Sequence, residues 1–147
     1  MVGHQPNYLP WLGFFDKMRS SDLFIIEDSV LLETDGFVRR NAIKGCHGLI
    51  WLTVPEERVG NQIPINKVKI STHDRSGWKK KHWLSIKYSF CKAPFWLEYK
   101  DFFEQTYSKE WYTLLDLNMH LIKGMRSFLG IETQCVLLNP SCFWEEK

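Results

Sequence analysis

Two ionisable side chains near the start of the chain are placed so that they could transfer a proton. His4 ends a short segment at the N-terminus, and Asp28 follows the continuous apolar run at residues 23–26. If both segments are parallel strands of one sheet, they end at the same edge, where α/β proteins bind ligands. His4 could then act as a base that Asp28 orients, or the two could bind a metal ion. Equally, His4 could bond a backbone carbonyl and stiffen the loop that follows it.

The triplet Arg39-Arg40-Asn41 is the main candidate for an anion-binding site. Adjacent residues of a strand point to opposite faces, so one of the two arginines would face inward. An inward guanidinium is costly unless it meets a carboxylate or a phosphate. We therefore predict that Arg40 and Asn41 hold an anionic substrate. The structural alternative is an ion pair of Arg40 with Glu27 or Asp28.

The remaining histidines carry no recognised cofactor motif. His47, His73 and His120 lack the spacing of a zinc site. The sequence also has neither a glycine-rich phosphate loop nor the Gly-x-Ser-x-Gly elbow of serine hydrolases. It therefore predicts no metal site and names no cofactor. Lysines 79–81 and His82 open a predicted helix; because three consecutive residues go round a helix, at least two of these lysines should be solvated.

Length and composition predict a single domain over residues 1–147, with 44% hydrophobic residues to form a core. Seven Trp, ten Phe and five Tyr are many for this length, so some should line a pocket or an interface. The formal net charge of +2 argues against nucleic acid or a membrane surface as a partner. No apolar run reaches the length of a membrane span. Four cysteines without a Cys-x-x-Cys pair, and no secretory signal, predict reduced thiols, no disulfide and a cytoplasmic location.

Proline placement and apolar spacing predict the elements that position these residues. Two prolines make residues 4–10 a loop, and apolar residues at helical spacing over 11–18 predict a short helix before the strand at 23–26. With a first strand that ends at His4, these form a right-handed β-loop-α-β unit. Next come a hairpin of strands 37–43 and 49–54 with a five-residue loop, and a short strand at 65–70. A helix follows from about residue 78, with Asp74 or Ser76 as its cap and Ala93-Pro94 at its end. Two more helices, at about 96–106 and 109–129, precede Gly130 as a C-cap and a final strand at 134–138. The predicted fold class is α/β, a parallel-sheet Rossmann-like core with a β-hairpin insertion and helices packed on the sheet.

Several motifs, in order along nearly the whole chain, resemble the WbqC-like protein family. They are the opening His-Gln-Pro-Asn-Tyr-Leu-Pro-Trp-Leu-Gly-Phe-Phe-Asp-Lys at 4–17, and residues 36–41, 51–55, 78–82, 93–94 and 129–133. Members of this family accompany bacterial surface-polysaccharide (O-antigen) gene clusters and secondary-metabolite pathways. Relatives continue beyond the strand at 134–138 with a further helix and strand. The resemblance therefore implies a fragment, a short natural variant or one half of a split pair.

The resemblance also bears on single residues. The Arg40-Asn41 pair matches a recurrent Arg-Asn of the family, and His82 belongs to a Lys-His pair that resembles the family's. Gln5, Tyr8 and Trp11 lie in the opening motif, where Tyr8 and Trp11 would wall the pocket. One departure follows Asp28, because Ser-Val-Leu stands where relatives often have Asp-Val-Gln.

The resemblance and the residues together imply a transferase-like enzyme of polysaccharide or secondary-metabolite biosynthesis. Its substrate would be anionic and phosphate-bearing, either a nucleotide-linked sugar or an acyl or aminoacyl group on a carrier protein. His4 would transfer the proton, Asp28 would orient it, and Arg40 with Asn41 would hold the anion. The alternative is a non-catalytic binding or scaffold protein for a partner enzyme or carrier. In either case a homo-oligomer or a partner subunit is possible.

Overall fold

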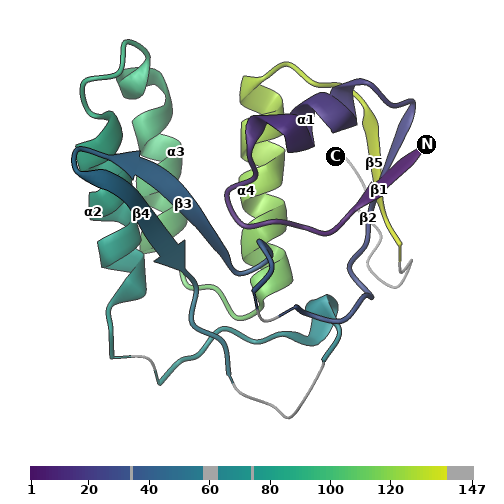
Figure 1. The fold of residues 1–147 in the computed structure, drawn as a ribbon, viewed down its shortest axis with the longest axis horizontal. Coiled ribbons are helices and arrows are strands. Elements are labelled where there is room, and N and C mark those ends of the chain that lie inside the picture. The colour runs from purple at the N-terminus through teal and green to yellow at the C-terminus, as the bar shows by residue number, and fades with distance from the viewer. Residues whose placement is uncertain (34, 58–62, 74, 139–147) are drawn as a thin grey trace.

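The computed structural model describes residues 1–33, 35–57, 63–73 and 75–138. A parallel three-stranded sheet contains both ends of this part of the chain (Figure 1). Its strands are β1 (Val2–His4), β2 (Leu23–Ile26) and β5 (Gln134–Leu137), in the order β1-β2-β5. Helix α1 (Leu12–Arg19) connects β1 to β2. The predicted β-loop-α-β unit and the parallel sheet are therefore confirmed.

Helices α1 and α4 (Leu114–Phe128) pack on this sheet. Pro10 prevents the helix α1 from starting earlier, and its eight residues bury a single apolar face. The core between sheet and helices consists of Phe14, Phe15, Met18, Phe24, Ile26, Leu115, Met119, Ile122 and Ile131. Trp11 and Leu12 were predicted to lie on the same stripe, but they are 60% and 77% exposed. The prediction was wrong here because Trp11 is the extended residue before the helix.

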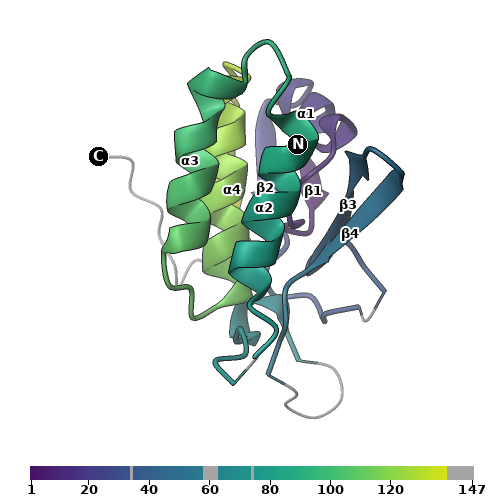
Figure 2. The ribbon, with the colours of Figure 1, turned by 90° about the vertical axis from the view of Figure 1, so that its left-hand side faces the viewer.

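A second core lies on the other side of α4, which runs between the two layers in Figure 1. This layer contains the antiparallel hairpin of β3 (Arg40–Gly45) and β4 (Gly48–Thr53), with α2 (Trp78–Phe90) and α3 (Trp96–Ser108) beside it (Figure 2). Helix α4 gives Leu114, Leu117 and Leu121 to this second core. It is buried on two sides, which explains why its apolar stripe is the clearest in the sequence.

The hairpin turn is shorter than predicted. Only Cys46 and His47 connect the strands, because Gly45 pairs with Gly48 and extends the ladder into the predicted loop. Gly48 has a φ of 130°, which side-chain-bearing residues rarely adopt. The predicted strand at 65–70 was also wrong.

Residues Ile65–Lys67 form a 3₁₀ helix, η1, instead of a strand. Ile65 and Val68 are fully buried, and their spacing of three fits the period of a 3₁₀ turn. Isolated bridges at Lys69 and Ile70 are what remains of strand pairing here.

One helix start and one helix cap differ from the sequence prediction. Helix α4 begins five residues later than expected, because the Thr113 hydroxyl accepts a bond from the Asp116 N–H and caps it there. Helix α2 begins after Gly77, whose φ is 65°, and no side chain caps it, so Ser76 is not the cap. The other predicted cap, Asp74, lies outside the described residues. None of the helices in the described part of the chain combines the length and apolarity that a membrane span requires.

Candidate functional site

Three buried aromatic side chains are hydrogen-bonded to one another where four elements meet. The Tyr8 hydroxyl lies 2.8 Å from His82 Nδ1 and 2.5 Å from the Tyr107 hydroxyl. The backbone carbonyl of Thr53 also lies beside the imidazole, where its hydrogen bond favours the protonated ring and raises the pKa of His82 against the effect of burial. The N-terminal loop, α2, α3 and β4 are thus joined at His82. We call Tyr8, His82 and Tyr107 the buried triad.

Burial sets the charge state of the triad. It lowers the pKa of His82 to about 4, against which the bond to Thr53 has a smaller, raising effect. It also raises the pKa of Tyr8 well above the usual value, with the neighbouring Tyr107 adding to the shift, and it raises the pKa of Tyr107. All three groups are therefore neutral at pH 7. His82 bonds the Tyr8 hydroxyl and Tyr8 bonds the Tyr107 hydroxyl, so the triad holds the N-terminal loop against α2 and α3.

Two asparagine amides hold the N-terminal loop. Asn41 Nδ2 donates to the carbonyls of Tyr8 and Leu9 at 3.3 and 2.6 Å. Asn118 Nδ2 donates to the carbonyls of Pro6 and Val38 at 2.7 and 2.6 Å. The Asn41 amide oxygen accepts from the following backbone N–H. The structure thus uses Asn41, a predicted substrate-binding residue, to support the loop.

His4 and Asp28 lie at the same edge of the parallel sheet, as predicted. His4 is in register with Ile26 on the neighbouring strand, two residues before Asp28. His4 Nδ1 lies 3.0 Å from the Gln5 carbonyl. This is the backbone bond that the sequence left open as an alternative to a catalytic role. The proton-transfer role of the pair stays a prediction.

Each of these two side chains also has a structural contact. The His4 ring packs edge-on against Phe14, with ring centroids 5.0 Å apart. Asp28 is buried, and Asn66 Nδ2 donates to its carboxylate at 3.3 Å. The Asn66 N–H also donates to the Asp28 backbone carbonyl, at 2.9 Å. Asp28 therefore anchors η1 to the end of β2.

Arg40 forms an ion pair that the sequence did not suggest. Its guanidinium lies 3.1 Å from the Asp35 carboxylate and 5.2 Å from the centroid of the Trp51 ring. The expected partners of an ion pair were Glu27 or Asp28. The Asp35 side chain is 87% exposed, so this pair contributes little to stability. Arg40 Nε is buried and has no hydrogen-bond partner within the described residues.

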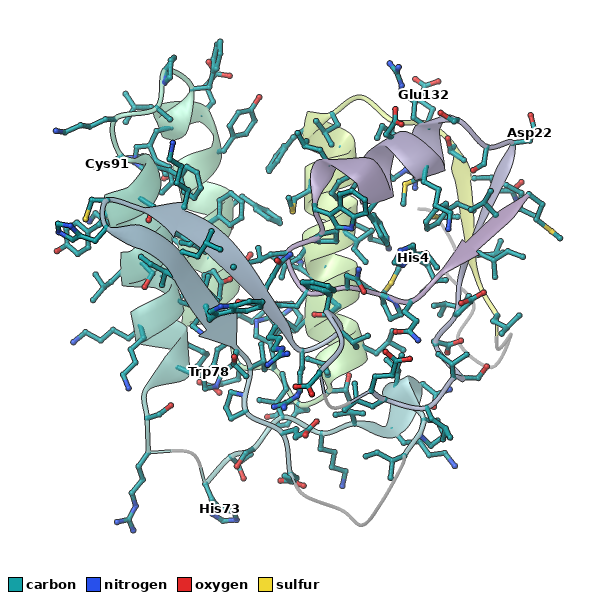
Figure 3. The ribbon with its side chains drawn as sticks, viewed as in Figure 1. His4, Asp22, His73, Trp78, Cys91 and Glu132 are labelled. Atoms are coloured by element: carbon teal, nitrogen blue, oxygen red, sulfur yellow. The ribbon has the colours of Figure 1, made fainter. Side chains whose placement is uncertain are left out.

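Two hollows lie on either side of α2 and share Trp78. The hairpin hollow, of about 530 Å³, lies between β4 and α2 and is lined by Trp51, Thr53, Ser76, Trp78, Lys81 and His82, among others. The α3 hollow, of about 570 Å³, lies between the start of α2 and the end of α3. Figure 3 places Trp78 at the start of α2, well apart from His4 beside the parallel sheet.

The hollows gather only some of the predicted site residues. His82 lines the hairpin hollow, Arg40 lies over its wall residue Trp51, and Tyr8 bonds His82 without lining the hollow itself. His4, Gln5, Asp28 and Trp11 line neither hollow.

Sequence reasoning missed the structural importance of two residues in this region. Tyr107 had no distinguishing signal in its helix. Asn118 did have one, because an amide within an otherwise apolar helical stripe is costly to bury without partners.

Metal ligands do not gather in the part of the chain that the structure describes. No three His, Cys, Asp or Glu side chains lie there as they would around a metal ion. Cys46, Cys91 and Cys135 are free thiols, and Cys142 lies outside the described residues. The predicted absence of a metal and of a disulfide stays a prediction.

Comparison with known proteins decides the family. A sequence model of the WbqC-like protein family matches residues 5–145. The chain belongs to the WbqC-like protein family. This WbqC-like chain is similar to an uncharacterized protein of Mycobacterium tuberculosis, Rv1507c, with 34% identity over 131 residues. The match covers 88% of the chain and 56% of Rv1507c, so the chain spans little more than half of that relative's length. No solved structure matches it.

Proposed function

We propose that this WbqC-like chain binds a phosphate-bearing substrate in the hairpin hollow, as a transferase-like protein of surface-polysaccharide (O-antigen) or secondary-metabolite biosynthesis. The observation that carries the proposal is one cation in the lining of this hollow and a second cation against a residue of its wall. Lys81 lines it, and the Arg40 guanidinium stacks on Trp51, which forms part of its wall. Lysine and arginine are the side chains that most often bind phosphate.

The two cations would bind a phosphate in complementary ways. Within the described residues Arg40 Nε has no hydrogen-bond partner, and the guanidinium bonds the carbonyl and the exposed carboxylate of Asp35, with which a phosphate can compete. Lys81 is exposed and supplies a mobile point charge. Thr53 and Ser76 add hydroxyl groups to the same lining. Neutral His82 below them adds no charge, so binding should persist from neutral pH down to about pH 5.

The substrate classes are a nucleotide-linked sugar and an acyl or aminoacyl group on the phosphopantetheine of a carrier protein. The protein would act in the bacterial cytoplasm, alone, as a homo-oligomer or with a partner subunit. His4 and Asp28 line neither hollow, so their proposed proton-transfer role is a separate proposal for the edge of the parallel sheet, where α/β proteins bind ligands.

A melting experiment with a matched lysine pair tests the binding site. UDP-glucose and coenzyme A serve as probes for the two substrate classes. We expect one of them to raise the Tm of the wild type. Lys81→Ala and Arg40→Ala should each weaken that ligand by about tenfold, as expected for a lost bond to a charged group. Lys80→Ala is the control, because the neighbouring Lys80 lines the other hollow. Equal ligand responses in Lys80→Ala and Lys81→Ala would contradict the proposed site.

A non-catalytic binding or scaffold protein is the second candidate. One observation favours it, because β4 presents Leu49 and Trp51 to solvent at 72% and 54% exposure. Exposed apolar side chains of this size often mark a protein interface. Turnover of a ligand that binds the hairpin hollow would exclude this candidate. Binding without turnover in the presence of acceptor substrates would favour it.

A further inference from the structure

The α3 hollow has no part in the proposed phosphate site, and its walls are aromatic. Trp78, Trp83, Trp111 and Tyr107 line it, and its volume of about 570 Å³ falls within the usual range of small-molecule sites. The Tyr107 hydroxyl is hydrogen-bonded to Tyr8 within the buried triad. Tyr107 therefore contributes an aromatic ring, and not a free hydroxyl group, to the lining of the hollow.

The aromatic walls are fixed before any ligand arrives. Trp111 Nε1 donates to the Thr106 carbonyl at 2.8 Å. Trp83 stacks on Trp96 with centroids 5.9 Å apart and an angle of 21°. Trp78 packs edge-on against His82, with ring centroids 5.2 Å apart. Preorganised walls lose little side-chain entropy when a ligand binds.

The polar groups around these walls carry balanced charge. The hollow is lined by two cations and two carboxylates, which are Lys79, Lys80, Glu104 and Glu110. Lys79 and Glu110 form an ion pair. The hydroxyl groups of three further lining residues, Ser71, Thr72 and Ser108, add neutral donors and acceptors. Two cations and two carboxylates favour neither an anionic nor a cationic ligand. They do offer many hydrogen bonds to a neutral one.

We propose that the α3 hollow binds the pyranose ring of a neutral saccharide. Such a ring has an apolar face that packs on indole and an edge of hydroxyl groups that bond to carboxylates, ammonium groups and other hydroxyls. The lining of the hollow contains both kinds of partner. This inference is independent of the phosphate site, because it requires no phosphate and uses the other side of Trp78.

NMR titration of the whole chain tests this proposal. The probes are D-glucose, N-acetyl-D-glucosamine and cellobiose, added to roughly 50 mM to detect a millimolar Kd. We expect at least one to shift the indole N–H signals of Trp83 and Trp111, with the Trp51 signal unchanged.

Two glutamates of α3 provide a matched pair of variants. Glu104→Gln removes a carboxylate from the hollow without changing its shape, and should weaken the saccharide by about tenfold. Glu98→Gln changes another exposed carboxylate on the same helix that does not line the hollow, and should leave the affinity within about twofold of the wild type. Both side chains are exposed, so both variants should fold.

Three results would overturn the inference. One is that no saccharide shifts the Trp83 and Trp111 signals. Another is that adenosine or choline binds the hollow while the saccharides do not, which would assign it to a nucleobase or a quaternary ammonium group. The third is an equal loss of affinity in Glu104→Gln and Glu98→Gln. Failure of UDP-glucose and coenzyme A to bind the hairpin hollow would leave these outcomes unaffected.

Discussion

Acidification should destabilise this protein through one histidine. His82 is 5% exposed and faces Tyr8, Tyr107, Trp78 and the Thr53 carbonyl. In the unfolded chain its imidazole has an ordinary pKa, whereas in the folded protein burial lowers the pKa to about 4. Between these values the unfolded state binds more protons than the folded state. The stability from neutral His82 is therefore fully present above pH 6.5 and is lost as the pH falls towards 4.

The size of the effect follows from the two pKa values. A folded pKa of about 4 against 6.5 corresponds to about 3 kcal/mol when the transition is complete. Most of it, about 2–3 kcal/mol, should be lost between pH 7.5 and 4.5. Losses of this size are a large part of the total stability of a small domain, which is about 5–15 kcal/mol.

Urea unfolding followed by tryptophan fluorescence at a series of pH values measures the effect. The comparison is between the wild type and His82→Gln, which cannot take up a proton. The variant should be less stable at neutral pH, but the difference between the two proteins should shrink by about 2–3 kcal/mol on going to pH 4.5. His120, whose pKa is also lowered by burial, contributes equally to both curves and cancels. His47→Gln, an exposed turn position, is the control and should follow the wild type. A stability difference that stays constant across this pH range would refute the reasoning.

Three further substitutions test the contacts that hold the loop and the helices. Tyr8→Phe should destabilise the protein by about 1–3 kcal/mol in urea unfolding, because two buried groups lose a partner, whereas Tyr112→Phe at an exposed position should be nearly neutral. Asn118→Leu should cost about 2–4 kcal/mol by the same assay, since two buried carbonyls lose their donor; an unchanged stability would show that water replaces the amide. Thr113→Ala should cost about 1 kcal/mol by removing the cap of α4, and Thr113→Ser should restore most of it.

The sequence by itself determined the elements with a clear period or a clear stop. The apolar run at residues 23–26, flanked by turn residues, could only be a buried segment, and Pro10 fixed where α1 could begin. From these the parallel arrangement followed, and with it the shared edge of His4 and Asp28. The family motifs were also in the sequence. They selected Tyr8, which the structure places in the buried triad.

Only the tertiary structure decided which polar residues meet. Tyr8, His82 and Tyr107 are separated by up to 99 positions in the chain, and no local pattern encodes their contact. Burial in a shared core changes the chemistry of each group, so His82 becomes a weak base and Asn41 a support for the loop. Whether residues 65–70 form a strand or a 3₁₀ turn likewise depended on long-range packing, since their apolar spacing fits both. The periodicity of apolar residues predicts which side of a helix or strand is buried. Which other element packs against that side depends on the fold of the whole chain.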